Sequence, residues 1–280
     1  MDRSNKIKIA FQGMKGAYSN MACNECFPKA KTIPCTSFEE MIEITKKGIS
    51  DYAMVPVENS LAGRVADIHN LIPDSGLNII AEHFQRVNHC LLGIPETKIN
   101  YLKTVKSHSQ GIAQCRKLIK KLNLHPIQHI DTAGAAAEIS EIQDKTVGAI
   151  ASEMSAKIYG LKILLKNIED ASHNTTRFLI MCRKPKLPPL NNKKTVTTII
   201  FEVRSVPAAL YKVLGGFATN GINLTKLESY IGGKNMEAAR FYVDAEGHPK
   251  SKPMLNALEE MKFYTTPKSI KILGSYNRNK

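Results

Sequence analysis

The chain has 280 residues, of which 43% are hydrophobic, and it carries a formal net charge of +14. At roughly 100–200 residues per domain this length favours two domains, and no apolar run approaches the roughly 20 residues that a membrane span needs. The N-terminal residues lack the apolar core of a secretion signal, so we expect a soluble, cytoplasmic protein without a membrane partner.

The basic charge indicates an anionic partner, and its distribution favours a small anion over nucleic acid. The excess lysines are spread along the chain, and the longest runs are Lys120-Lys121 and Lys193-Lys194. Aromatic residues make up 6% of the chain and tryptophan is absent, whereas nucleic-acid binders usually concentrate basic residues and interleave stacking aromatics. The six cysteines show no zinc-ribbon spacing, and we expect them to be reduced thiols.

The first part of the chain alternates between expected strands and helices. Strands are expected at residues 8–11, 53–57, 88–93, 147–151 and 177–182. Helices are expected through residues 21–23, after the Ser37-x-x-Glu40 capping box, at 110–122 with one apolar face, and after Asp131-Thr132. Strands that alternate with helices of about ten or more residues predict an α/β domain with a largely parallel sheet.

The segment from Lys184 to Asn192 breaks this alternation. It holds three prolines, which continue neither a helix nor a central strand, so we place the domain boundary there. Beyond it we expect a strand at 195–203, a helix opened by Pro207, strands at 222–231 and 238–245 around a Gly232-Gly233 turn, a helix at 252–261 and a strand at 270–273. This βαββαβ order predicts a ferredoxin-like second domain.

Three polar clusters are expected where strands give way to helices, at residues 13–19, 56–63 and 131–135. Each places hydroxyls and free backbone N–H groups at an expected helix N-terminus, where partial positive charge favours anions. A Ser or Thr there also serves as an ordinary helix cap. Several such clusters at the carboxyl ends of strands in one α/β domain indicate a cleft for a small anion.

Residues 174–178, with the sequence Asn-Thr-Thr-Arg-Phe, stand ahead of an apolar strand. A guanidinium that is always charged and is flanked by hydroxyls suits a carboxylate, and a solvated Arg at the start of a surface strand is the alternative. His108-Ser109-Gln110 offers a second polar edge. The histidines do not fall in metal-ligand spacings and no phosphate-binding or dinucleotide glycine pattern is present, so we expect neither a metal nor a cofactor.

Taken together, these segments resemble prephenate dehydratases over nearly the whole chain. The turn at 13–19 is similar to the family's Gly-Pro-x-Gly-Thr-Phe/Tyr-Ser, with Met14 and Ala17 as departures. Residues 56–63 match its Pro-x-Glu-Asn-Ser-x-x-Gly, and 108–110 resemble its His-Pro-Gln. Residues 132–136 resemble its helix start, and 176–178 keep its Thr-Arg-Phe. The ordered set of motifs is highly specific for the family, although each piece alone is not.

The resemblance implies conversion of prephenate to phenylpyruvate in phenylalanine biosynthesis. It implies a two-lobed α/β catalytic domain at residues 1–187, of type 2 periplasmic-binding-protein architecture. Thr176 would donate a hydrogen bond to the departing hydroxyl, and Arg177 would hold a substrate carboxylate or orient the Thr176 loop. Glu58 would be either an acid or the partner of Arg177. The residues expected to bind substrate are Ser19, Asn59, Ser60, Gln110, Thr132, Asn174 and Phe178.

The second domain, at residues 195–280, resembles ACT regulatory domains, which bind amino acids at subunit interfaces. The resemblance implies regulation by phenylalanine and a homodimer or homotetramer. Pro207-Ala208-Ala209-Leu210 stands where the family carries Gly-Ala-Leu, and Tyr230-Ile231 stands where many members have Arg-Pro. The residues expected to bind the effector are Ala208, Ala209, Leu210, Asn223, Leu224, Glu228 and Ser229.

Two alternatives stay open. Arogenate dehydratases perform the same chemistry on a substrate that bears an ammonium group, and no residue separates the two substrates at this stage. A non-catalytic sensor of a small anion or amino acid is the second alternative, because two-lobed α/β domains also serve as solute-binding proteins. The intact Thr176-Arg177-Phe178 favours catalysis over the sensor.

Overall fold

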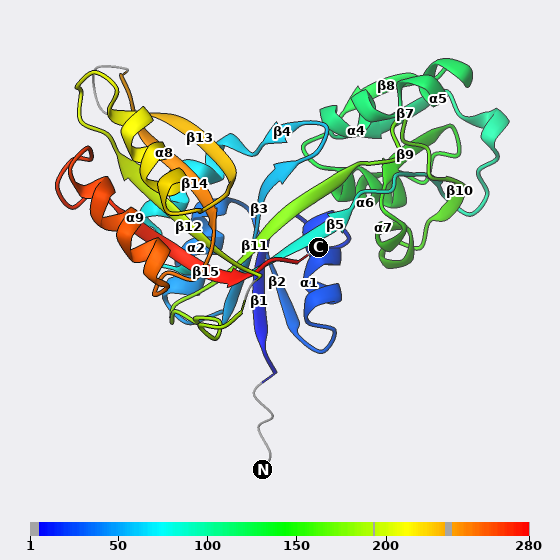
Figure 1. Ribbon diagram of the computed structural model, residues 1–280. Coiled ribbons are helices and arrows are strands. Elements are labelled where there is room, and N and C mark those ends of the chain that lie inside the picture. Colours follow the sequence, from blue (N-terminus) through cyan, green and yellow to red (C-terminus); the bar gives the residue numbers. More distant parts are fainter. Residues whose placement is uncertain (1–5, 193, 233–236, 280) are drawn as a thin grey trace, which may run out of the picture. The chain divides into compact units, whose positions relative to one another are not determined.

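The computed structural model describes residues 6–192, 194–232 and 237–279 (Figure 1). The chain forms two compact units. Unit 1 holds the residues up to His69 together with His83–Phe178, and unit 2 holds Asn70–Glu82 together with the residues from Leu179 on. These units differ from the predicted ranges 1–187 and 195–280, which stay predictions. No helix of the described residues is long and apolar enough to cross a membrane.

The first sheet of unit 1 contains β1 (Lys8–Gln12), β2 (Lys31–Cys35), β3 (Tyr52–Asn59) and the short β4 (Gly63–Arg64). Strand β1 pairs in parallel with β2 on one side and with β3 on the other. The connecting helices α1 (Tyr18–Cys26) and α2 (Phe38–Lys46) lie on opposite sides of β1 in Figure 1. In a sheet with this 2-1-3 order, a crevice opens at the carboxyl ends of the first and third strands.

The second sheet of unit 1 has the strand order β10-β6-β9-β7-β8. Its strands are β6 (Cys90–Gly93), β7 (Thr104–Ser107), β8 (His125–Gln128), β9 (Val147–Ala151) and β10 (Lys162–Lys166). Strand β7 pairs in parallel with β8 and β9, which repeats the 2-1-3 order of the first sheet, and β6 and β10 are antiparallel. The helices of this part are α4 (Ser109–Gln114), α5 (Arg116–Lys121), α6 (Thr132–Ile142) and α7 (Glu153–Ile158), with the 3-10 turn η2 (Ile99–Tyr101).

The expected helix starts in unit 1 are confirmed by their caps. Helix α2 begins after Ser37, whose Oγ accepts the N–H of Glu40 at 3.2 Å. The Glu40 carboxylate accepts the N–H of Thr36 at 2.6 Å, so the reciprocal bond of the capping box reaches one residue further back than expected. Helix α6 begins after Asp131, whose Oδ1 accepts the N–H of Gly134 at 2.6 Å.

The single helix expected at 110–122 is wrong, because the structure divides it into α4 and α5 at Cys115. The cause lies far along the sequence, at Asp170. The Asp170 N–H donates to the carbonyl of Gln114 at 2.6 Å, and its carboxylate accepts the N–H of Lys117 at 3.2 Å. Asp170 therefore satisfies backbone groups on both sides of the break, as a capping residue does.

Unit 2 confirms the expected βαββαβ order. Its elements are β12 (Thr195–Glu202), α8 (Ala209–Thr219), β13 (Leu224–Gly232), β14 (Glu237–Glu246), α9 (Lys252–Lys262) and β15 (Lys271–Asn277). The strands form an antiparallel sheet in the order β13-β14-β12-β15, which is the ferredoxin-like arrangement. Alternate residues of β12 and β14, such as Phe201 and Phe241, pack with α8 and α9 in one core. The expected turn at Gly232-Gly233 lies partly outside the described residues.

Four further elements lie near the division between the units along the chain. They are α3 (Ala66–Leu71), the 3-10 turn η1 (Ile72–Asp74), β5 (Asn78–Arg86) and β11 (Thr175–Cys182). Strand β5 was not among the expected strands, and within unit 2 its residue Ile79 pairs with Gly274 of β15. Strand β11 begins two residues earlier than expected, at Thr175, next to the end of β3, because the N–H of Ser60 donates to the Thr175 carbonyl at 2.9 Å.

Ala208, which precedes helix α8, adopts the left-handed region with φ of 61°. A Cβ atom is strained in this region by about 1–2 kcal/mol, and glycine avoids that strain. We expect Ala208→Gly to raise the free energy of unfolding by about 0.5–1 kcal/mol, after the extra entropy of glycine in the unfolded chain. Urea unfolding of both proteins measures this, with Ala218→Gly in the exposed helical part of α8 as a control that should destabilise. A lower stability for Ala208→Gly would contradict the strain.

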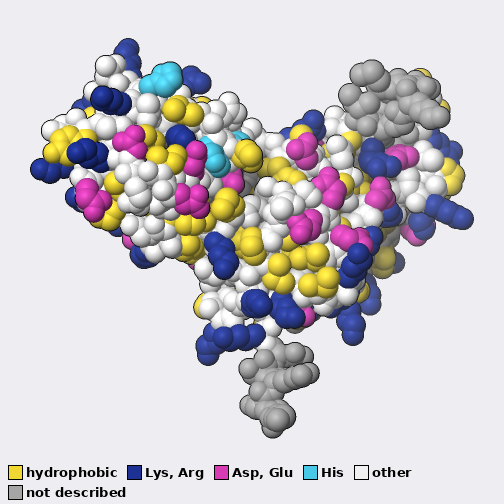
Figure 2. Space-filling view, turned by 180° about the vertical axis from the view of Figure 1, so that it is seen from behind, with side chains coloured by type: hydrophobic (Ala, Val, Ile, Leu, Met, Phe, Trp, Pro, Cys, Tyr) yellow, Lys and Arg dark blue, Asp and Glu magenta, His cyan; other side chains and the backbone are white. Residues whose placement is uncertain are grey.

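On the face that Figure 2 shows, the basic side chains do not form a cluster. Lys and Arg side chains are dispersed there among acidic and hydrophobic ones. Nucleic-acid binding needs positive charge concentrated along the backbone that it tracks. The view therefore offers no stripe for a nucleic acid on this face, and the absence of a nucleic-acid partner stays a prediction.

Candidate active site

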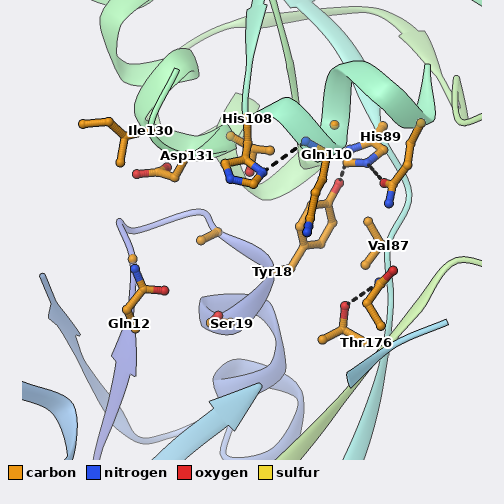
Figure 3. A pocket seen from close by; sticks show the side chains of 16 residues that line it. Gln12, Tyr18, Ser19, Val87, His89, His108, Gln110, Ile130, Asp131 and Thr176 are labelled. Atoms are coloured by element: carbon orange, nitrogen blue, oxygen red, sulfur yellow. Dashed lines mark hydrogen bonds between the residues drawn. The ribbon is translucent and has the colours of Figure 1, made fainter. Parts of the chain in front are cut away.

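A cavity of about 260 Å³ lies in unit 1 and is lined by residues of both sheets (Figure 3). From the first sheet come the residues at the ends of β1 and β3, and from the second sheet come the residues that follow β7 and β8. The ends of β1 and β3 form the crevice of the first sheet, which is the position at which open α/β sheets bind ligands. The lining residues are Gln12, Gly13, Ala17, Tyr18, Ser19, Asn59, Val87, His89, His108, Gln110, Gly111, Gln114, Ile130, Asp131, Thr132 and Thr176.

The structure brings half of the expected catalytic and substrate-binding residues to this cavity. Ser19, Asn59, Gln110, Thr132 and Thr176 line it. The other expected residues, which are Glu58, Ser60, Asn174, Arg177 and Phe178, stand beside the lining. Their roles in binding or catalysis stay predictions.

Thr176 lines the cavity with a hydroxyl whose hydrogen-bond direction is fixed by Asn59. The Asn59 Oδ1 accepts the N–H groups of Leu61 at 3.0 Å and Ala62 at 2.9 Å, so the amide nitrogen faces the other way. That Nδ2 donates to the Thr176 Oγ1 at 3.0 Å. In the described part of the chain the Thr176 hydroxyl has no other partner. Its own proton is therefore left to donate into the cavity.

The same amide starts a chain of hydrogen bonds through the wall of the cavity. Asn59 Nδ2 donates to Asn174 Oδ1 at 2.8 Å, and Asn174 Nδ2 donates to Gln114 Oε1 at 2.8 Å. Because Gln114 Oε1 is an acceptor, the His89 Nε2 at 2.8 Å from it must carry a hydrogen. The direction of every bond from Asn59 to His89 thus follows from two backbone N–H groups.

Tyr18 is the last residue in this chain of hydrogen bonds, because it contacts the second ring nitrogen of His89. Its hydroxyl oxygen lies 2.9 Å from the His89 Nδ1 and 2.8 Å from the Asn88 carbonyl. With a hydrogen on Nε2, a neutral His89 ring has Nδ1 as an acceptor, so the one proton of Tyr18 is shared between two acceptors. The rings of Tyr18 and His89 meet edge to face, with centroids 5.5 Å apart.

Burial sets the protonation of this pair. It lowers the pKa of His89 below its ordinary value of 6.5, although the hydrogen bond to Gln114 and the charge of Glu169 act in the opposite direction. Burial also raises the pKa of the Tyr18 hydroxyl well above its ordinary value of 10.0. At neutral pH the wall of the cavity therefore holds a neutral imidazole and a neutral phenol.

The lowered pKa of His89 predicts a loss of stability in acid. The unfolded chain takes up a proton at His89 near its ordinary pKa of 6.5, before the folded protein does. The contribution of the neutral His89 ring to the stability of the fold is therefore fully present above pH 6.5. It is lost as the pH falls from there through the folded-state pKa. Urea unfolding on both sides of that pH should show a smaller loss for His89→Gln than for the parent. His125→Gln, on the exposed strand β8, should keep the parent's loss, and an unchanged loss in His89→Gln would contradict the assignment.

Arg177 points away from the cavity, because it alternates with Thr176 along strand β11. Its guanidinium lies 3.9 Å from the Glu58 carboxylate, and the Arg177 side chain is 11% exposed. Neither residue lines the cavity. The ion pair ties the end of β3 to the start of β11 and so holds the two strands that carry Asn59 and Thr176.

Three of the remaining expected residues support this arrangement from outside the lining. Ser60 Oγ donates to the His173 carbonyl at 2.8 Å and accepts the N–H of Thr175 at 3.0 Å, which fixes the loop after β3. Asn174 is 1% exposed and joins Asn59 to Gln114. Phe178 is 1% exposed and belongs to the core.

The loop between β1 and α1 is held against the second sheet's side of the cavity. The Gly16 carbonyl accepts the hydroxyls of Ser152 at 2.6 Å and Ser155 at 3.1 Å, and the Tyr159 hydroxyl donates to the Lys15 carbonyl at 2.8 Å. Gly16 has φ of 92°, and a Cβ there would lie 2.7 Å from the Ser155 Oγ. Glycine is therefore needed for this close approach.

The neutral donors of the cavity suit a carboxylate at the His108 side, although Asp131 is itself a carboxylate in the lining. The His108 Nδ1 accepts the N–H of Gln110 at 3.3 Å, so the ring hydrogen lies on Nε2 (Figure 3). Ser19 and Thr132, which lie in the first turns of α1 and α6, also line the cavity. Helix N-termini and hydroxyls of this kind bind anions without a fixed positive charge. The described residues contain no group of His, Cys, Asp or Glu that could hold a metal ion.

Sequence reasoning missed Tyr18, His89 and Gln114 as parts of the site. Tyr18 stands in a motif that the sequence singles out, next to Ser19. His89 and Gln114 are separated by 25 residues, and each lies 60 residues or more from its partner Tyr18 or Asn174. No local spacing signals such contacts, so only the fold reveals them.

Comparisons with known proteins bear on this cavity. The family model described as prephenate dehydratase matches residues 9–186. A relative from Komagataeibacter europaeus, named bifunctional N-acyl-homoserine lactone acylase/prephenate dehydratase, is 46% identical over 96% of this chain and 95% of its own. An Arabidopsis thaliana relative, named arogenate dehydratase/prephenate dehydratase 1, chloroplastic, is 37% identical over 97% of this chain and 72% of its own.

The solved structures agree with the sequence relatives. The structure of a prephenate dehydratase from Arthrobacter aurescens in complex with L-Phe matches with a TM-score of 0.88 and 28% identity, over 97% of this chain and 90% of that one. The match extends over both compact units, because it covers nearly the whole chain.

Proposed function

Because the chain belongs to the prephenate dehydratase family, we propose that it removes carbon dioxide and water from prephenate and releases phenylpyruvate, a step of phenylalanine biosynthesis. The observation that carries this proposal is the Thr176 hydroxyl, which accepts from Asn59 and keeps its own proton for the cavity. A hydroxide leaving from a ring carbon needs such a donor.

The chemistry asks for little beyond orientation and one donor. In prephenate the bond between the ring and its carboxylate breaks and the electron pair enters the ring. The hydroxyl on the opposite ring carbon leaves as hydroxide, which accepts a hydrogen bond from Thr176 and becomes water by taking up a proton from solvent. Aromatisation drives the reaction. A hydrogen bond that strengthens as the oxygen gains charge lowers the barrier, because it stabilises the transition state more than the bound substrate.

The remaining lining residues fit the binding of two carboxylates. Ser19, Thr132 and Gln110 offer hydroxyl and amide donors at the cavity, and His108 offers Nε2. We assign Glu58 and Arg177 to holding β3 against β11 rather than to contact with substrate, since their ion pair lies outside the lining. The two sheets of unit 1 would form the two lobes of a type 2 periplasmic-binding-protein architecture, with residues 1–187 as the catalytic domain.

Two features of unit 2 support an ACT regulatory domain at residues 195–280. It has the ferredoxin-like strand order, and Ala208 has a left-handed backbone where ACT domains carry glycine. Phenylalanine would bind near the start of α8 and along β13. Of the expected effector residues, Ala209 is buried, Leu210 and Leu224 pack on the core, Asn223 bonds Glu246 at 3.1 Å, and Glu228 pairs with Lys226 at 3.0 Å.

The solved relative in complex with L-Phe supports phenylalanine as the effector, and a homodimer or homotetramer follows from the ACT proposal. The six cysteines are all free in the structure. Free thiols are typical of a reducing compartment, which supports a cytoplasmic location.

Phenylpyruvate formation from prephenate by the purified chain, with and without phenylalanine, tests the proposal. We expect turnover that phenylalanine suppresses. Turnover that phenylalanine does not suppress would support the proposed enzyme activity and contradict the proposed effector site. A folded chain that binds prephenate but never releases phenylpyruvate would contradict the proposed enzyme activity and favour a non-catalytic sensor.

A further inference from the structure

The charge that lines the cavity is unusual for a site that receives a dianion. Among the described lining residues none is Lys or Arg, and Asp131 is the one carboxylate. Arg177, the cation that the sequence predicts at the site, pairs with Glu58 outside the lining. Lys15, which lines the adjoining depression together with Asp131, makes no ion pair with it. A negative group is therefore built into a wall that otherwise offers neutral donors.

Asp131 has one oxygen committed to the fold and one available to a ligand. Its Oδ1 accepts the N–H of Gly134 at 2.6 Å and caps helix α6. Its Oδ2 has no hydrogen-bond partner in the described part of the chain. A carboxylate oxygen of this kind accepts strongly from a cation with N–H groups, since such a bond is charge-assisted.

Asp131 lies where the proposed mechanism would place the side chain of the substrate. Figure 3 shows Asp131 and Thr176 at opposite sides of the cavity. In prephenate and in arogenate, the hydroxyl that leaves and the three-carbon side chain stand on opposite carbons of the ring. With the hydroxyl at Thr176, the side chain reaches toward Asp131. That side chain carries a ketone in prephenate and an ammonium in arogenate, next to a carboxylate in both.

We propose that Asp131 binds the ammonium group of arogenate and makes this amino acid a substrate of the cavity alongside prephenate. The inference rests on the proposed dehydratase function and names its second substrate. The helix N-terminus beside Asp131 takes the neighbouring carboxylate of the same side chain, so the two ends of the amino-acid group meet opposite charges. Asp131 is then the residue that sets the preference between the two substrates.

The test compares kcat/KM on arogenate and on prephenate for the parent chain and Asp131→Asn. Asparagine still caps α6, because its Oδ1 accepts the N–H of Gly134, and the charge is lost. We expect the ratio of arogenate to prephenate kcat/KM to fall by about 10–100-fold, the scale of one charged hydrogen bond. Asp131→Ser, a second capping residue without charge, should move the ratio in the same direction.

Asp144→Asn is the matched control. Asp144 belongs to the same part of unit 1, accepts the N–H of Thr146 at 2.8 Å and is absent from the cavity lining. It should leave the ratio unchanged.

An equal loss on both substrates in Asp131→Asn and Asp131→Ser would assign Asp131 to the helix cap alone and overturn the inference. So would a parent chain that converts prephenate and not arogenate. A parent chain that converts neither compound would overturn the proposed function itself, and the inference with it.

Discussion

Replacing Thr176 by valine should lower the rate constant for phenylpyruvate formation by about 100-fold. Valine keeps the branched shape of the side chain and removes only the hydroxyl, so the cavity retains its volume. The lost group accepts from Asn59 at 3.0 Å, and in the proposed mechanism it donates to the departing oxygen. A single-turnover measurement at saturating prephenate reports the chemical step, and KM should change less than kcat, because the bond strengthens in the transition state.

Thr176→Ser is the control for this variant. Serine keeps a hydroxyl that accepts from Asn59, so it should retain most of the rate. A rate constant near that of the parent in Thr176→Val would remove the hydroxyl from the mechanism. Equal losses in the serine and valine variants would assign Thr176 to packing of the strand instead.

Asn59→Asp should lower the rate constant by a similar factor, although the variant keeps the Thr176 hydroxyl. The new carboxylate still accepts the N–H groups of Leu61 and Ala62, which hold Asn59 in place. Its second oxygen, however, faces Thr176 as an acceptor and takes the proton that the cavity needs. We expect kcat to fall by about 100-fold, since the donor to the leaving oxygen is turned away.

The pH dependence separates this explanation from simple damage to the fold. A protonated carboxyl donates to Thr176 as the amide does, so the rate of Asn59→Asp relative to the parent should rise as the pH is lowered. The ratio to the parent at each pH removes the contribution of His89. A relative rate that stays flat with pH would contradict the reversed hydrogen bond.

Local sequence signals predicted the elements that depend on local contacts. The capping box at Ser37 and the cap at Asp131 place the starts of α2 and α6 correctly, because each bond joins residues three apart. The break between α4 and α5 escaped prediction, because its cause, Asp170, lies 53 residues from Lys117. Strand β8 was also missed, and its exposed residues carry no apolar pattern.

The candidate site follows the same division between local and distant contacts. Asn59 and Thr176 stand in motifs that the sequence singles out, yet the bond between them spans 117 residues and no spacing shows which group orients the other. The face of strand β11 on which Arg177 lies depends on the alternation of side chains along that strand. Because β11 is continuous through Thr175–Cys182, Arg177 alternates away from Thr176 and pairs with Glu58. His89 escaped prediction altogether, since its partners come from two other elements.

A double-mutant cycle on Asn59 and Thr176 tests the central claim most directly, which is that Asn59 acts through the orientation of the Thr176 hydroxyl. The rate constants for phenylpyruvate formation are compared for the parent, Asn59→Asp, Thr176→Val and the double variant. If the account is correct, the double variant loses about 100-fold, no more than Thr176→Val alone, because a hydroxyl that is absent has no orientation to lose. Losses that multiply to about 10,000-fold would show that the two residues act independently and would contradict the account.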